Sequence, residues 1–134
     1  MSVVKSTTLR VAAESDIVKV RQAVRAGTME IRCSLVEQTK VVTAASELGR
    51  NLLVYGGGGE VRLEWLDERA RRGLRVVFED HGPGIFDTQL ALKEGYTTGG
   101  GMGLGLGGAR RLVDDFELVS KPGEGTRVAI TKWK

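Results

Sequence analysis

Cysteine, proline, aromatic residues and long hydrophobic runs are all scarce in this chain of 134 residues. Cys33 is the only cysteine, which excludes an intramolecular disulfide and a zinc site built from several cysteines. No apolar run has the length that crosses a membrane, and no charged-then-apolar leader precedes the first strand-like segment. A net charge of +3 does not by itself indicate nucleic-acid binding. We therefore expect one cytoplasmic domain over residues 1–134, with no membrane or nucleic-acid partner.

The order of the hydrophobic patterns predicts an α+β fold. Two segments of helical period follow an initial strand. Later segments alternate apolar and polar residues; in one of them, Val61, Leu63 and Trp65 are the apolar positions. We expect a two-layer α/β sandwich with helices on one face of a mixed, mainly antiparallel sheet. A charged turn is predicted at Asp67–Gly73. The predicted helices are Asp16–Ile31, Ser34–Tyr55, Asp87–Glu94 and Ala109–Asp115, and the predicted strands are Thr7–Ala13, Glu60–Leu66, Leu74–Asp80, Phe116–Ser120 and Thr126–Lys132.

The second predicted helix carries a candidate catalytic pair. Ser34 and Glu37 form a capping box at its start. Glu47 and Asn51 lie one turn apart, next to the buried stripe of Val41, Ala45, Leu48 and Leu52. The amide oxygen of Asn51 is a hard ligand that suits Mg²⁺, and Glu47 could accept a proton from an attacking hydroxyl. Taken alone, the pair is better explained as two solvated surface residues, because a Glu and an Asn four residues apart are common.

A D-x-G-x-G pattern follows the third predicted strand at Asp80, Gly82 and Gly84. By strand parity, Asp80 shares a face with apolar residues such as Val76 and Phe78. A buried carboxylate is costly unless it meets a partner, and the amino group of a nucleobase would be one. The two glycines would let the backbone approach a flat ring closely. An ordinary glycine turn capped by Asp80 explains this loop equally well.

A glycine lid extends from Gly95 to Gly108, where eight of fourteen residues are glycine. Such a segment has a high ordering entropy, so we expect a ligand to fix it. Backbone N–H groups at the following helix start, near Ala109, would bind an anion. Gly103, Gly105 and Gly108 match G-x-G-x-x-G, but no strand–turn–helix opening precedes them, which argues against a dinucleotide-binding motif. No G-K-S/T follows, which excludes a Walker P-loop.

The last predicted strand places a hydroxyl on its apolar face. Thr126 has the same parity as Val128 and Ile130, so its side chain could reach a nucleotide base or Asp80. A half-buried β-branched strand residue is an equally good interpretation of Thr126 on its own.

Together these motifs resemble the GHKL superfamily of ATPases and kinases. The matching segments are S-E-L-G-R-N at 46–51, E-D-H-G-P-G-I at 79–85, the glycine lid, and G-E-G-T at 123–126. Within the superfamily the chain is most similar to the small serine/threonine kinases of bacterial partner-switching pathways, in the RsbT-like branch of stressosome switch kinases. Residues 94–101 and 109–116 carry this finer resemblance.

The resemblance implies a Bergerat-type fold that binds ATP and Mg²⁺ between sheet and helices. Glu47 would be the general base, and Arg50 would orient it or touch a phosphate. Asn51 would be the Mg²⁺ ligand, and Asp80 would accept a hydrogen bond from the adenine amino group. The implied nucleotide-binding residues are Asn51, Asp80, Gly82, Gly84, Ile85, Thr97, Gly101, Met102, Gly103, Leu104, Gly105 and Thr126.

The resemblance also implies partners. A kinase of this branch would phosphorylate STAS-domain antagonist and scaffold proteins of a stressosome, then bind a downstream phosphatase or another output enzyme. The alternative is an anti-sigma factor that sequesters an RNA polymerase sigma subunit and phosphorylates its own antagonist, since both share these motifs. His81 stands where many relatives carry asparagine. It does not indicate a histidine kinase, because the chain has no room for a dimerisation and acceptor helix pair.

A third interpretation, nucleic-acid binding, rests on arginines around the charged turn. Acidic neighbours offset them, so a solvated hairpin is the simpler interpretation. The arginines are Arg62, Arg69, Arg71, Arg72 and Arg75, and the acidic residues are Glu60, Glu64, Asp67 and Glu68.

Overall fold

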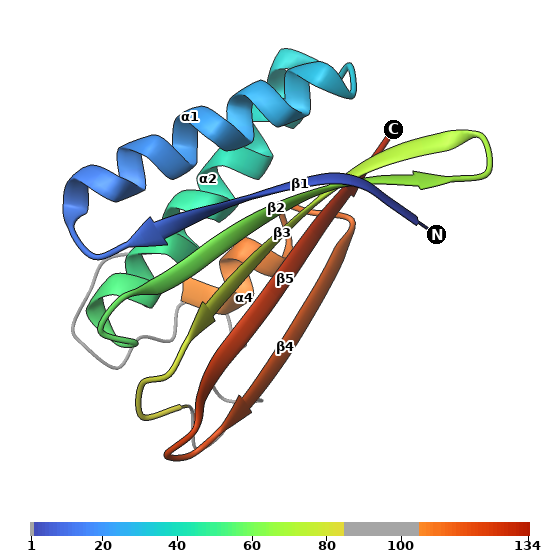
Figure 1. The fold of residues 1–134 in the computed structure, drawn as a ribbon. Helices are drawn as coiled ribbons and strands as arrows, with labels where there is room; N and C mark the ends of the chain where they lie inside the picture. Colours follow the sequence, from blue (N-terminus) through green and yellow to red (C-terminus); the bar gives the residue numbers. More distant parts are fainter. Residues whose placement is uncertain (1, 85–104) are drawn as a thin grey trace.

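The computed structural model describes residues 2–84 and 105–134. Figure 1 shows two layers, with the helices on one face of a twisted sheet. This arrangement confirms the predicted α+β two-layer sandwich. The strands are β1 (Ser2–Val11), β2 (Gly59–Glu68), β3 (Arg71–Asp80), β4 (Asp115–Lys121) and β5 (Gly125–Trp133), and the helices are α1 (Glu14–Glu30), α2 (Leu35–Val54) and α4 (Gly105–Arg110).

The five strands form one sheet in the order β1-β2-β3-β5-β4. Each neighbouring pair is antiparallel. A mixed sheet had been expected, but the described sheet is antiparallel throughout. The hairpins β2–β3 and β4–β5 meet where β3 pairs with β5 (Figure 1). This pairing sets the end of β3 beside the start of β5, with Asp80 opposite Thr126.

Alternating strand residues and helical stripes build the core between the two layers. Leu63, Val76 and Ile130 stand in register across β2, β3 and β5, and each is at most 1% exposed. Val24 of α1 and Leu48 of α2 are buried in the same cluster. Burying a side chain of this size stabilises the fold by about 1.5–3 kcal/mol. The predicted apolar faces are thus confirmed, and they determine which face of each helix packs against the sheet.

A capping box fixes where α2 begins, as predicted. Ser34 Oγ accepts a hydrogen bond from the amide of Glu37 at 3.1 Å, and the Glu37 carboxylate accepts one from the amide of Ser34 at 2.8 Å. The bond from the Ser34 backbone, followed by that from Lys134, lowers the pKa of Glu37 to about 2.

Within the described ranges, no helix has both the length and the apolar character that a membrane span requires.

The turn predicted at Asp67–Gly73 was wrong, because the β2–β3 hairpin continues through it. Asp67 pairs with Arg72 and Glu68 with Arg71, so opposite charges face each other across the ladder. Two residues connect the strands, and Arg69, the first of them, has the positive φ of 54° that such a tight turn needs. The first strand likewise begins at Ser2, five residues before the predicted start.

The helix predicted at Ala109–Asp115 was also misplaced. Helix α4 occupies Gly105–Arg110, and β4 already begins at Asp115. The amide of Leu112 donates to the carbonyl of Ala109 at 3.1 Å, which is a tight turn that ends the helix. The amide of Asp114 then donates to the carbonyl of Thr131 at 3.1 Å, so the chain joins the sheet instead of continuing as a helix.

The sheet face opposite the helices carries paired charges. Glu64 accepts hydrogen bonds from Arg75 at 2.6 Å and from Arg62 at 3.1 Å. Burial opposes ionisation of Glu64, but these two bonds outweigh it and hold the pKa of Glu64 below its ordinary value. Arg71 forms an ion pair with Glu68 at 3.0 Å. Three of the five arginines considered for nucleic-acid binding are therefore already paired with carboxylates.

Candidate functional site

Helix α2 presents Glu47 and Asn51 beside its buried stripe. The stripe residues Val41, Ala45, Leu48 and Leu52 are at most 3% exposed. Glu47 and Asn51 are half-buried and lie one helical turn apart. In the described part of the chain, neither side chain forms a hydrogen bond or an ion pair. Both polar groups therefore have no partner among the described residues.

The segment Tyr55–Gly59 ends α2 and leads into β2. The carbonyl oxygen of Asn51 accepts hydrogen bonds from the amides of Tyr55 at 2.9 Å and Gly56 at 3.2 Å. Gly57 and Gly58 have φ angles of 76° and 98°, in the left-handed region that favours glycine. The predicted end of the helix at the glycine run is confirmed, and the same bonds fix the backbone of Asn51.

Asp80 lies at the end of β3 on the face towards the helices. It is 8% exposed, as its strand parity predicted. Its Oδ1 accepts a hydrogen bond from the amide of Gly82 at 2.8 Å. The carboxylate lies so close to Gly56 that a methyl carbon at position 56 would come within 2.5 Å of Asp80 Oδ2. The end of α2, which carries Asn51, is therefore packed against Asp80.

Gly82 and Gly84 are both required by contacts within the protein. A methyl carbon at Gly82 would lie 2.8 Å from the carbonyl oxygen of Gly56, and one at Gly84 would collide with the carbonyl of Lys121. Gly84 also has a φ of 76°. The loop after Asp80 is thus held between the end of α2 and the β4–β5 turn. The contact of these glycines with a flat ring remains a prediction.

Thr126 lies opposite Asp80, but its hydroxyl contacts another residue. Thr126 Oγ1 and Ser120 Oγ are 2.8 Å apart, and Ser120 Oγ also donates to the carbonyl of Gly125 at 3.0 Å. Ser120 was not among the site residues predicted from the sequence. Its parity with Phe116 and Leu118 on β4 was the available signal, since it places the hydroxyl on the helix-facing side of the sheet.

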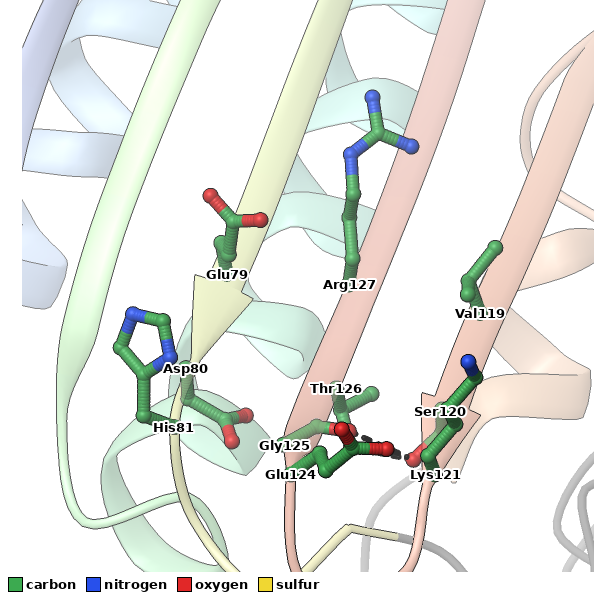
Figure 2. A pocket seen from close by; sticks show the side chains of 10 residues that line it. All are labelled: Glu79, Asp80, His81, Val119, Ser120, Lys121, Glu124, Gly125, Thr126 and Arg127. Carbon is green, nitrogen blue, oxygen red and sulfur yellow. Dashed lines mark hydrogen bonds between the residues drawn. The ribbon is translucent and has the colours of Figure 1, made fainter.

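A shallow hollow of about 240 Å³ lies at the ends of β3, β4 and β5. Figure 2 shows its lining, which includes Asp80, Thr126 and the charged side chains of Glu79, Lys121 and Arg127. Glu79 and Arg127 are register partners whose parity places them on the sheet face away from the helices. Glu47 and Asn51 do not line this hollow. The hollow therefore takes side chains from both faces at the strand ends, whereas Gly56 and Asn51 lie on the side of α2.

Arg50 lies at the protein surface in this structure. Its guanidinium forms an ion pair with Glu14 at 3.6 Å, and the two side chains are 57% and 66% exposed. The pair joins the end of α2 to the start of α1. An exposed ion pair of this length contributes little to stability, so it leaves Arg50 available to a stronger anion. A contact of Arg50 with Glu47 or phosphate remains a prediction.

Part of the predicted site lies outside the described residues. This part comprises the expected helix Asp87–Glu94 and the nucleotide-binding residues Ile85, Thr97, Gly101, Met102, Gly103 and Leu104. Gly105 is described and is the first residue of α4, so the helix begins four residues before the start predicted at Ala109. Leu106 and Ala109 of α4 are buried in the core, and α4 packs against α2.

The amide oxygen of Asn51 fits a hard cation that takes most of its ligands from phosphate oxygens. Among residues 2–84 and 105–134, no group of three or more His, Cys, Asp or Glu side chains could hold a metal alone. The half-buried amide of Asn51 has no hydrogen bond within those ranges. Mg²⁺ uses few protein ligands and takes the rest from phosphates and water, so an amide oxygen that has no partner among the described residues would suit it.

Comparisons with known proteins place this geometry in a family. Residues 11–132 match the family model described as the histidine kinase-like ATPase domain. The chain is 42% identical over 125 residues to the serine/threonine-protein kinase RsbT of Bacillus subtilis (strain 168), covering 93% of this chain and 94% of that protein. It is 29% identical to the anti-sigma F factor of Clostridium novyi (strain NT), covering 84% and 82% of the two chains.

A solved structure shares the fold. The crystal structure of the RsbU and RsbW domains of a Mycobacterium tuberculosis protein matches with a TM-score of 0.62 and 18% sequence identity. The match covers 96% of this chain and 32% of that longer one. At this identity, the likeness supports the architecture alone.

Proposed function

The chain belongs to the histidine kinase-like ATPase domain family, and on this premise we propose that it is an ATP- and Mg²⁺-dependent serine/threonine protein kinase. One observation supports the proposal: Gly56, whose amide donates to the backbone carbonyl of Asn51, is packed against the buried carboxylate of Asp80. On this proposal, Asn51 as a metal ligand and Asp80 as an acceptor for a base would serve one site. The 42% identity to RsbT supports the choice of serine or threonine as acceptor. We assign residues 1–134 to a single kinase domain.

Asp80 would select the base of the nucleotide. Its Oδ1 is engaged by the amide of Gly82, whereas Oδ2 has no hydrogen bond within the described ranges. A carboxylate oxygen accepts a bond from the amino group of adenine. Gly82, Gly84 and Thr126 would line the same end of the site. Ile85, Thr97 and the segment Gly101–Gly105 would contact the rest of the nucleotide and its phosphates.

Glu47 and Asn51 would act at the phosphate end. Bound Mg²⁺ would neutralise charge on the transferred phosphoryl group, with the amide oxygen of Asn51 as its protein ligand. Glu47, one turn earlier, would take the proton of the attacking hydroxyl as its oxygen bonds to the γ-phosphorus and the bond from that phosphorus to the ADP oxygen breaks, releasing ADP. Arg50 would orient Glu47 or contact a phosphate. Such a kinase works mainly by positioning its groups and neutralising charge.

We infer a place in a bacterial partner-switching pathway. The resemblance to RsbT supports STAS-domain antagonist and scaffold proteins of a stressosome as substrates. It also supports a downstream phosphatase or another output enzyme as the second partner, bound once the kinase is released. The kinase would change partners in the cytoplasm.

The test is phosphate transfer from ATP to a purified STAS-domain protein encoded by the same genome. Glu47→Ala should keep the affinity for ATP and slow transfer by about 10²–10⁴-fold, because only proton removal is lost. Thr43→Ala is the matched control, since Thr43 is exposed one turn earlier on α2. Transfer at the normal rate by Glu47→Ala would exclude Glu47 as the base. Failure of the wild type to phosphorylate any STAS-domain protein of its genome would reject this substrate class.

An anti-sigma factor is the second candidate, supported by the relative at 29% identity. The two functions share an active site and differ in the protein that is held. Purification from the native cell, with and without ATP, separates them. Recovery of a large STAS-domain assembly favours the switch kinase, whereas recovery of an RNA polymerase sigma subunit favours the anti-sigma factor.

A further inference from the structure

Gly56 occupies the narrowest place between α2 and β3. A methyl carbon at position 56 would lie 2.5 Å from both Cγ and Oδ2 of Asp80, and 2.7 Å from the carbonyl oxygen of Leu52. Non-bonded carbon atoms in proteins approach to about 3.5–4.0 Å. Any side chain at position 56 would therefore have to displace the Asp80 carboxylate or the end of the helix.

The requirement at Gly56 is for space and not for an unusual backbone. Gly56 is absent from the described glycines with positive φ, whereas Gly57 has a φ of 76° and open space where its Cβ would be. The two neighbours thus separate the causes: Gly57 is needed for its conformation, and Gly56 for the room it leaves to Asp80.

The same short segment also contacts the metal-ligand end of the site. The amide of Gly56 donates to the carbonyl of Asn51 at 3.2 Å, and the backbone of Gly56 lies where a methyl carbon at Gly82 would come within 2.8 Å. Gly82 in turn donates to Asp80 Oδ1 at 2.8 Å. A continuous chain of contacts therefore runs from Asn51 through Gly56 to both oxygens of Asp80.

We propose that Gly56 is a positioning residue that sets base selectivity by fixing the Asp80 carboxylate relative to Asn51. The inference rests on the proposed function, in which Asp80 accepts a hydrogen bond from the adenine amino group. Guanine presents a carbonyl oxygen at the corresponding position, and a carboxylate repels it. Displacing Asp80 should therefore weaken binding of ATP but not binding of GTP, which relies on phosphates and Mg²⁺ and would lose an unfavourable contact.

The experiment measures the affinities of ATP and GTP, each with Mg²⁺, for the wild type, Gly56→Ala, Asp80→Asn and the control Gly57→Asn. Asparagine tolerates positive φ, so the control adds a side chain where there is room. We expect the ratio of ATP to GTP affinity to fall by about 10-fold in Gly56→Ala and Asp80→Asn, the size of one hydrogen bond to a charged group. The control should keep the wild-type ratio.

The ratio distinguishes positioning from loss of folding, because unfolded protein lowers both affinities equally. If Gly56→Ala keeps the wild-type ratio while Asp80→Asn loses it, the role of Gly56 is refuted and the proposed function stands. If the wild type itself does not bind ATP, the proposed function fails.

A stability cycle gives a second, independent measurement. Asp80→Ala removes the two carboxylate atoms that a methyl group at position 56 would strike. The fall in melting temperature caused by Gly56→Ala should therefore be smaller in the Asp80→Ala background than in the wild type. An equal fall in both backgrounds would show that the methyl group does not act through Asp80, and would overturn the inference.

Discussion

Replacement of Asn51 by alanine should separate metal binding from folding. Within the described ranges the amide of Asn51 makes no hydrogen bond, and the bonds to its backbone carbonyl do not depend on the side chain. Alanine has the higher helix propensity, by about 0.5 kcal/mol. The variant should therefore be as stable as the wild type, or more stable by about that amount, which corresponds to about 2 °C in melting temperature.

Nucleotide titrations complete the test. In the wild type, adding Mg²⁺ should raise the affinity for ATP, and in Asn51→Ala that increase should disappear. Asn51→Asp is the matched control, because it keeps an oxygen ligand at the same position and should retain a dependence on Mg²⁺. A stability loss well above 1 kcal/mol in urea unfolding would show that the amide has a structural role. An unchanged dependence on Mg²⁺ in Asn51→Ala would show that Asn51 is not the ligand.

Two further predictions concern the start of α2. Ser34→Ala removes the acceptor for the amide of Glu37 and should lower the free energy of unfolding by about 1 kcal/mol, measured by urea denaturation; an unchanged midpoint would contradict the capping box. The pKa of Glu37 is lowered to about 2, so its ionised form stabilises the fold above its ordinary pKa of 4.5, and this stabilisation is lost as the pH falls towards 2. The melting temperature of the wild type should therefore exceed that of Glu37→Gln at pH 6, with the difference shrinking towards pH 2; a difference independent of pH would refute the assignment.

Local periodicity was sufficient to predict the layers, the buried face of Asp80 and the buried stripe of α2. Asp80 was expected on the buried face from the parity of β3, and the stripe of α2 placed Glu47 and Asn51 beside the core. These predictions succeed because strand and helix periods determine side-chain direction without knowledge of the neighbours. The start of α2 succeeded for the same reason, since the capping box of Ser34 and Glu37 lies within four residues.

Contacts between distant segments could not be predicted in the same way. In the sequence, Gly56 indicates only the end of a helix, whereas its contact with Asp80, 24 positions later, appears when β3 packs beside α2. The ion pair of Arg50 with Glu14 has the same origin. The misplaced last helix also reflects tertiary structure, because the amide of Asp114 donates a hydrogen bond to the carbonyl of Thr131 in β5. Each failure involves a partner from another element of the fold.

Calorimetric titration of ATP with Mg²⁺ into the purified chain tests the central claim most directly. The account predicts saturable binding of one nucleotide per chain, which weakens when Mg²⁺ is withheld and when GTP replaces ATP. Material that unfolds cooperatively, and is therefore folded, yet gives neither heat nor saturation with ATP and Mg²⁺ would contradict the account.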